Sequence, residues 1–196
     1  VFEDAMLNSL SSFIFFNKCE IVTLIQEDDK YLDDLFALLS DANTALDKRR
    51  DSVLFLKEFC SYAQLLQPHA KEAFYKSLIS LGILPALEVI LNINDSKIKS
   101  ASVDILTTIV EYSPSLIRDY TLSQFNNQEH EDDQCLLNIA IEQMLNDSEP
   151  ELGGAVQLTG VLRILLAPET MLASANKSEK TDFLNFFYKN SIHILI

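Results

Sequence analysis

The chain has 196 residues, and its 29 acidic residues against 15 basic ones give a net charge of −14. Hydrophobic residues make up 48% of the chain and charged residues 22%, which excludes a disordered polypeptide and indicates a folded protein with a sizeable core. Because polyanions bind through Lys and Arg, we expect no nucleic acid and no membrane among its partners.

Helices are expected along most of the chain. It contains 4 Gly and 5 Pro, too few for the many short strands and turns of an all-β fold. Apolar residues recur at intervals of three and four, as they do on one face of a helix. In chain order this spacing predicts helices over 4–16, 20–26, 31–40, 46–66, 70–81, 84–91, 98–112, 115–120, 134–145, 152–166, 169–173 and from 180 to the end.

Several residues mark where these helices begin and end. Asp95 and Ser96 precede a helix whose first amides their side chains can accept. Pro114 suits the first turn of a new helix and ends the previous one at the residue before it. Gly82 ends a helix where a left-handed residue is needed, and Pro85 starts the next.

One pattern occurs three times: a short apolar helix, then an aspartate, then a long helix. The aspartates are Asp41, Asp95 and Asp147. Equivalent apolar positions lie 52 and 54 residues apart, which is longer than the usual armadillo or HEAT unit. These positions are Leu38, Ile90 and Met144. We expect inserted loops to account for the excess, chiefly at 124–134.

The middle copy is the most similar to an armadillo repeat, with GILPAL at 82–87, Ile90-Leu91, Asp95, Ile98, Ala101 and Ile105. The small Ala101 allows close packing of helices. We therefore predict an all-α fold, an armadillo/HEAT-like helical-repeat solenoid with a right-handed superhelix. The prediction for 1–196 is a single domain, a segment of a longer protein. Its units are expected at roughly 31–82, 83–125 and 134–175, with flanking helices at 4–26 and 180–196.

Cysteine and histidine placement points to no metal site. Cys19, Cys60 and Cys135 are far apart, without CxxC spacing, and indicate reduced, mostly buried thiols. His130 stands among acidic residues at 129–133, but no second His or Cys lies at ligand spacing apart from the nearby Cys135. We therefore predict no metal and interpret this stretch as a flexible acidic insertion.

Catalytic motifs are also missing from the sequence. There is no GxSxG, HExxH or P-loop pattern. Paired carboxylates such as Asp33-Asp34 are expected on helix surfaces of an acidic protein and not beside a pocket. Gly153-Gly154 has no phosphate-loop context and is interpreted as the start of a long helix or a place of close packing. We predict no catalytic residue, no cofactor and no enzymatic activity.

The shape itself is the remaining signal, because stacked helix pairs form a concave groove that holds partner proteins. Polar residues outside the apolar stripe of the long helices are the candidates for this groove, against the alternative of an ordinary solvated face. They are Lys57, Ser61, Gln64, Asp104, Thr108, Glu111, Gln157 and Arg163. The apolar run at 183–196 is either a partner site or, as we favour, packs beneath the preceding repeat.

Several stretches together resemble a known family, the SMEK proteins, which are regulatory subunit 3 of protein phosphatase 4. They are VFED at 1–4, FIFFNK at 13–18, FLKEFC at 55–60, GILPALEVIL at 82–91, PELGGAVQL at 150–158, LASANK at 172–177 and FFYK at 186–189. The resemblance is to the family's central armadillo-like region and covers nearly the whole chain. It implies an amino-terminal pleckstrin-homology-like domain and a disordered tail elsewhere in the protein.

The resemblance also implies function. Family members do not hydrolyse phosphate; they assemble with the phosphatase 4 catalytic subunit and a second regulatory subunit. They direct the enzyme to substrates in the nucleus, at centromeres and in the cytoplasm, including proteins of dividing neural precursors. We expect a protein-binding scaffold that raises the substrate concentration near the catalytic subunit. One alternative is a groove that reads a linear peptide of a substrate or localisation factor without contacting the catalytic subunit; another is a mere spacer.

Overall fold

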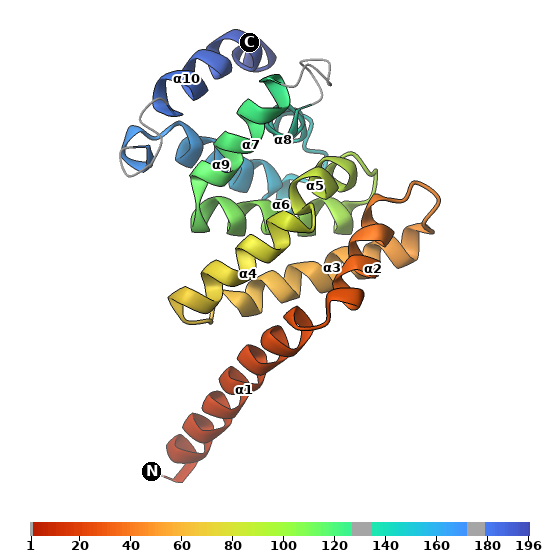
Figure 1. Cartoon of the computed structure of the whole chain (residues 1–196), viewed down its shortest axis with the longest axis vertical. Coiled ribbons are helices and arrows are strands. Elements are labelled where there is room, and N and C mark those ends of the chain that lie inside the picture. The colour runs from red at the N-terminus through yellow and green to blue at the C-terminus, as the bar shows by residue number, and fades with distance from the viewer. Residues whose placement is uncertain (1, 127–134, 172–178) are drawn as a thin grey trace. The chain divides into compact units, whose positions relative to one another are not determined.

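A computed structural model describes residues 2–126, 135–171 and 179–196 of the chain (Figure 1). Every regular element within these ranges is a helix, so the predicted all-α class is confirmed. The α-helices are α1 Phe2–Gln26, α2 Asp29–Ser40, α3 Leu46–Ala63, α4 Pro68–Ser80, α5 Ile83–Leu91, α6 Ser96–Tyr112, α7 Pro114–Asn126, α8 Leu136–Leu145, α9 Gly154–Leu166 and α10 Glu179–Asn190. The 3-10 helices are η2 Pro150–Leu152, η3 Pro168–Thr170 and η4 Ile192–Leu195.

The helices group into two compact units, Val1–Ile83 and Leu84–Ile196. Within each unit, the helices pack mainly against one another. The single domain over 1–196 and its repeat boundaries stay predictions.

The first unit has its core where α2 and α3 pack together and against the C-terminal part of α1. Val22 of α1, Leu39 of α2 and Leu56 of α3 are completely buried there. The Phe59 ring of α3 meets the Phe74 ring of α4 edge-on, with 4.9 Å between centroids. Apolar burial of this kind is the main stabilising term of the unit.

The second unit has its core around α6, which packs against α7 and α9. Ile98, Ile105 and Ile109 of α6 are buried at the three- and four-residue spacing that predicted this helix. At the C-terminal end, Phe183 and Phe187 of α10 are buried as well. The apolar run of α10 therefore contributes to the core of this unit.

Three of the predicted helix boundary signals are confirmed, whereas Pro85, predicted to start a helix, is the third residue of α5, which begins at Ile83. Asp95 is the N-cap of α6, and its carboxylate accepts the Ile98 amide at 3.0 Å. Gly82 has a φ of 86°, the left-handed conformation that favours glycine. Pro114 is the first residue of α7.

The three aspartates of the repeated pattern have one local role in common. Each accepts a backbone amide in the connection that leads to a long helix, either α3, α6 or α9. Asp41, Asp95 and Asp147 accept the amides of Asn43, Ile98 and Glu149 at 2.9, 3.0 and 3.0 Å. The Ile98 amide is a first-turn donor of α6, whereas the Asn43 and Glu149 amides belong to the turns before α3 and α9.

The first helix differs from its prediction, because 4–16 and 20–26 form one continuous helix, α1. The polar segment between them contains neither Gly nor Pro, so no residue interrupts the helical hydrogen bonds. The Asn17 side chain donates to the Phe13 carbonyl at 2.7 Å within the helix. Sequence polarity alone therefore gave a false break.

Other boundaries shift by a few residues. The helix predicted over 46–66 ends at Ala63, and the one over 115–120 continues to Asn126. At the C-terminal end, α10 ends at Asn190 and is followed by η4. The predicted insertion at 124–134 lies outside the described residues from 127 onward.

The connection before α9 is also different. Pro150–Leu152 forms η2, and α9 begins at Gly154, because Gly153 adopts a left-handed φ of 73° that separates the two helices. This confirms the interpretation of the glycine pair as a helix start. The helix predicted over 169–173 is the 3-10 turn η3, and its part beyond Met171 lies outside the described residues.

In the described part of the chain, no single helix is both long and apolar enough to cross a bilayer. The bent pair α4 and α5 meets that test jointly, by length and composition alone. Phe74 and Leu78 of α4 and Leu87 and Ile90 of α5 are buried within the protein.

Candidate protein-binding surfaces

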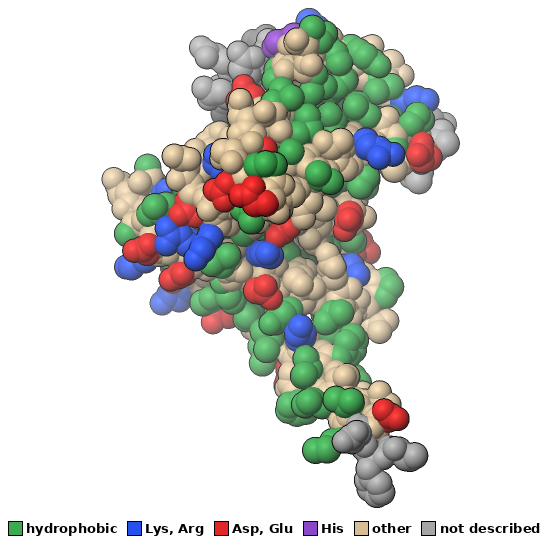
Figure 2. Space-filling view, turned by 180° about the vertical axis from the view of Figure 1, so that it is seen from behind, with side chains coloured by type: hydrophobic (Ala, Val, Ile, Leu, Met, Phe, Trp, Pro, Cys, Tyr) green, Lys and Arg blue, Asp and Glu red, His purple; other side chains and the backbone are tan. Residues whose placement is uncertain are grey.

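The first helix exposes an apolar surface along much of its length. Figure 2 shows hydrophobic side chains along α1, at the lower end of the view. The large apolar residues that are at least 40% exposed are Met6, Leu7, Leu10, Phe13, Ile14, Phe16, Ile21 and Leu24. Phe13 is 66% and Phe16 is 68% exposed. Contiguous apolar surface of this kind is typical of protein interfaces.

Most of these residues form one stripe, which we call the α1 seam. Its positions follow alternating intervals of three and four: Leu7, Leu10, Ile14, Asn17, Ile21 and Leu24. The stripe extends for roughly 25 Å at 1.5 Å per residue. This spacing is typical of an amphipathic helix that lays its apolar face into a hydrophobic groove of a partner. Sequence reasoning predicted α1 as a flanking helix and missed its exposed face.

Contacts within the first unit occupy a different face of α1. The Lys18 ammonium lies 4.6 Å from the centre of the Tyr62 ring on α3. The Cys19 thiol lies 3.9 Å from the Leu65 carbonyl, and Val22 is completely buried. Helical geometry turns the α1 seam roughly a quarter-turn away from Val22, at 100° per residue. The seam therefore remains accessible while the helix is held by its other face.

The groove candidates of the first unit lie on α3 and at its end. Lys57 is half-buried, while Ser61 and Gln64 are exposed. Their spacing of four and three residues places them on one side of the helix. Their role in binding stays a prediction.

The candidates of the second unit lie on α6 and α9, and the structure brings two of them together. The Gln157 amide of α9 donates to the Asp104 carboxylate of α6 at 2.9 Å. The Thr108 hydroxyl donates to the Asp104 carbonyl, also at 2.9 Å. Asp104 and Gln157 thus link the two helices. Glu111 and Arg163 are exposed farther along the same helices.

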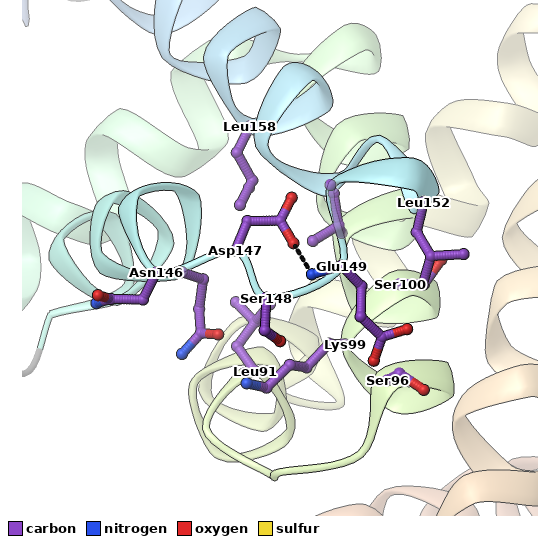
Figure 3. A pocket seen from close by; sticks show the side chains of 13 residues that line it. Leu91, Ser96, Lys99, Ser100, Asn146, Asp147, Ser148, Glu149, Leu152 and Leu158 are labelled. Atoms are coloured by element: carbon purple, nitrogen blue, oxygen red, sulfur yellow. Dashed lines mark hydrogen bonds between the residues drawn. The ribbon is translucent and has the colours of Figure 1, made fainter.

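A small pocket lies between the start of α6 and the turn that joins α8 to α9 (Figure 3). Its cavity volume is about 50 Å³, far below the roughly 300–1,000 Å³ of sites for drug-sized ligands. Leu91, Leu152 and Leu158 contribute apolar surface, and Lys99 and Glu149 contribute charges. The space suits a single side chain and not a cofactor. Leu152 and Gly154, from the PELGG stretch at 150–154, are among the residues that line this pocket.

The Asp147 carboxylate holds the turn beside this pocket. It accepts the Glu149 amide at 3.0 Å and the Ala155 amide at 2.9 Å, so it spans η2 and the first turn of α9. A negative charge here also complements the positive end of the α9 dipole. The turn therefore depends on one side chain with two backbone partners.

Replacing Asp147→Ala is expected to destabilise the second unit by about 1–2 kcal/mol, because two amide hydrogen bonds and a helix cap are lost. The chain has no Trp, so unfolding in urea is best followed by circular dichroism. Glu151→Ala is the matched control, since Glu151 is exposed in the same turn. Equal urea midpoints for the two variants would contradict the role of Asp147.

Arg118 is the largest fully buried side chain, and sequence analysis did not identify it. Its guanidinium donates to the Leu165 carbonyl at 3.2 Å and to the Thr170 carbonyl at 2.9 Å. It also lies 6.0 Å from the centre of the Phe183 ring. One α7 side chain thereby connects the end of α9, η3 and α10. A cation at the carboxyl end of α9 is favourable for the helix dipole.

A second polar cluster joins α5, α7 and α8. The Gln124 amide donates to the Glu88 carboxylate at 2.5 Å, and its oxygen accepts the Leu136 amide at 3.3 Å. Burial, together with the charge of Glu88 and a hydrogen bond to it, raises the pKa of Tyr120. These hydrogen bonds are structural links between helices.

None of the three cysteines forms a disulfide; Cys60 and Cys135 are buried and Cys19 is half-buried. Burial raises the pKa of the Cys60 thiol from 9.0 to about 12. Iodoacetamide at about pH 8 is therefore expected to alkylate Cys19 and spare Cys60 in the folded protein, since the thiolate is the reactive form. Peptide mass spectrometry measures this, with the urea-unfolded chain as control. Rapid alkylation of folded Cys60 would show that its site is open.

Within the described ranges, no group of three or more His, Cys, Asp or Glu side chains is placed to hold a metal ion. His130 and its acidic neighbours lie outside those ranges.

Comparison with known proteins identifies the family of the chain. The model of the family phosphatase 4 regulatory subunit 3 matches residues 1–196. The chain is similar to serine/threonine-protein phosphatase 4 regulatory subunit 3 of Drosophila melanogaster, at 65% identity over 194 residues, covering 99% of this chain and 19% of that protein. It is similar to protein PPP4R3C1 of Mus musculus, at 41% identity over 196 residues, covering 100% of this chain and 24% of that protein. No solved structure matches the chain significantly.

Proposed function

This chain belongs to the phosphatase 4 regulatory subunit 3 family, and we propose that it is a scaffold segment that binds the phosphatase and helps to direct it to substrates. The family is a regulatory subunit of a phosphatase and not itself catalytic. The chain spans about a fifth to a quarter of the length of these relatives. What the whole protein binds and where it acts is therefore part of the proposal.

The exposed α1 seam is the observation that carries this proposal. Leu7, Leu10 and Leu24 are each more than half exposed in a helix whose other face is packed. We assign the seam to the phosphatase 4 catalytic subunit, because a phosphatase regulatory subunit requires a surface for the phosphatase. The partner surface must be a hydrophobic groove roughly 25 Å long that matches the stripe.

The long helices support the proposed repeat architecture. α6 and α9 occupy equivalent places in the repeated pattern, and they pack directly against each other in the second unit. Equivalent helices of successive units stack in this way in armadillo and HEAT solenoids. We therefore propose the armadillo/HEAT-like solenoid for the chain, with its right-handed superhelix.

The proposed mechanism is recruitment. A segment that holds the catalytic subunit while another part of the protein holds a substrate raises the local substrate concentration. We include a second regulatory subunit among the partners. The proposed places of action are the nucleus and the cytoplasm, including centromeres during cell division.

Size-exclusion chromatography with light scattering tests the proposal. The purified chain is mixed with the phosphatase 4 catalytic subunit and the second regulatory subunit. Co-elution with the mass of a complex is the expected result. A folded chain, shown by circular dichroism, that elutes alone would overturn the assembly role of these residues.

The alternative function is a groove that reads a linear peptide of a substrate or localisation factor without contacting the catalytic subunit. It is favoured by an open groove between α7 and α10 in the second unit. In that case peptide binding persists although the chain elutes apart from the catalytic subunit.

A further inference from the structure

α7 and α10 leave between them a groove with a volume of about 550 Å³. This volume lies within the roughly 300–1,000 Å³ range of ligand sites, unlike that of the pocket at the α8–α9 turn. The groove is open along one side and is formed by residues other than those of the α1 seam. Its lining combines aromatic, amide and carboxylate groups.

The apolar part of the groove is a pair of aromatic rings. The Phe125 ring lies edge-on to the Phe186 ring, with 5.5 Å between centroids. Phe186 is buried, whereas Phe125 is 39% exposed and offers one side of its ring to the groove. The Lys189 ammonium lies 5.6 Å from the centre of the Phe125 ring, within the range of a cation–π interaction. A ligand with an apolar side chain can cover the exposed ring.

The amide part of the groove is Asn190 at the end of α10. Asn190 is 5% exposed, and its side-chain nitrogen is buried without a hydrogen-bond partner. An unpaired buried donor is unfavourable, and a carbonyl oxygen from a ligand satisfies it. Backbone carbonyls of an extended peptide are the most frequent source of such an acceptor.

The charged groups of the groove are two carboxylates and one amine, that of Lys189 beside the Phe125 ring, so the acidic groups outnumber the basic one. Asp119 on α7 and Asp182 on α10 line its two walls and are both exposed. The whole chain carries a net charge of −14, so its field also favours cationic partners. An anionic ligand such as nucleic acid is disfavoured by the same field.

We propose that this groove binds an extended, basic segment of another protein. An apolar side chain of the segment packs on Phe125, a lysine or arginine pairs with Asp182, and a backbone carbonyl accepts from Asn190. The groove shares no residue with the α1 seam. The site thus recruits a substrate or localisation protein with a basic-apolar motif.

Fluorescence anisotropy on the full-length protein tests this site. The probes are a fluorescein-labelled nonapeptide that alternates lysine with leucine and phenylalanine, and a matched peptide with glutamate for lysine. The lysine peptide is expected to bind at least about tenfold more tightly than the glutamate peptide. Asp182→Lys, Phe125→Ala and Asn190→Ala are each expected to weaken its binding by about tenfold, at unchanged melting temperature for the exposed Asp182.

Asp51→Lys is the matched control, because it makes the same charge change at an exposed site on α3. Its expected effect is less than about twofold. Equal weakening by Asp51→Lys and Asp182→Lys would mean diffuse attraction to an acidic protein and would overturn the site. So would unchanged binding by Phe125→Ala. Glutamates introduced in the α1 seam are expected to leave peptide binding unchanged. Failure of the peptide site can therefore be distinguished from failure of the proposed assembly with the phosphatase.

Discussion

Replacing Leu10→Glu together with Ile14→Glu is expected to abolish binding of the phosphatase 4 catalytic subunit, with a loss of about 100-fold or more in affinity. Both residues lie in the middle of the α1 seam and are about half exposed. The two glutamates add no strain to the free chain, because their side chains point to solvent. In the proposed complex they place two charges in a hydrophobic groove, which costs several kcal/mol. Surface plasmon resonance measures the affinity.

The same helix provides a matched control. Asn8→Glu together with Ser12→Glu adds the same two charges on a polar side of α1, and both positions are exposed. This pair is expected to change affinity by less than about threefold. Equal loss in both pairs would indicate that helix charge, and not the seam, determines binding. No loss in the seam pair would remove α1 from the interface.

Arg118→Ala is expected to destabilise the second unit by about 3–5 kcal/mol. The substitution leaves the Leu165 and Thr170 carbonyls without their guanidinium donor and opens space beside Phe183. Lysine at this position would keep the positive charge, but its ammonium cannot reproduce the planar arrangement of hydrogen bonds that the guanidinium donates. Thermal unfolding followed by circular dichroism measures the change.

Arg163→Ala removes an arginine of the same size from an exposed position on α9 and is the control for Arg118. Its expected effect is within about 0.5 kcal/mol, as for most surface changes. If both variants unfolded at the same temperature as the parent chain, Arg118 would not hold α7, α9 and α10 together.

The helices themselves could be predicted because local rules determine them. Ile98, Ile105 and Ile109 follow a helical spacing, and Asp95 is placed to accept an amide of the first turn. The helix break that was wrongly predicted within α1 shows where such local rules fail. A polar segment without Gly or Pro continues a helix, so polarity alone is a weak stop signal.

The binding surfaces could be predicted less well, because they depend on which faces pack. Asp104 and Gln157 fitted the pattern of groove residues, yet they bond to each other across 53 positions of sequence. The carbonyl partners of Arg118 lie 47 and 52 positions away in the sequence. No local sequence motif predicts such distant partners. The apolar residues of α1 predict a helix, but spacing does not tell whether its face is buried within the chain.

Hydrogen exchange of the full-length protein, with and without the phosphatase 4 catalytic subunit, tests the central claim most directly. The account predicts that amides of residues 6–24 exchange at least about tenfold more slowly in the complex, because the exposed helix becomes covered. The amides of α6 are expected to change little, since that helix is already buried. A complex that forms while exchange along α1 stays unchanged would contradict the assignment of the α1 seam.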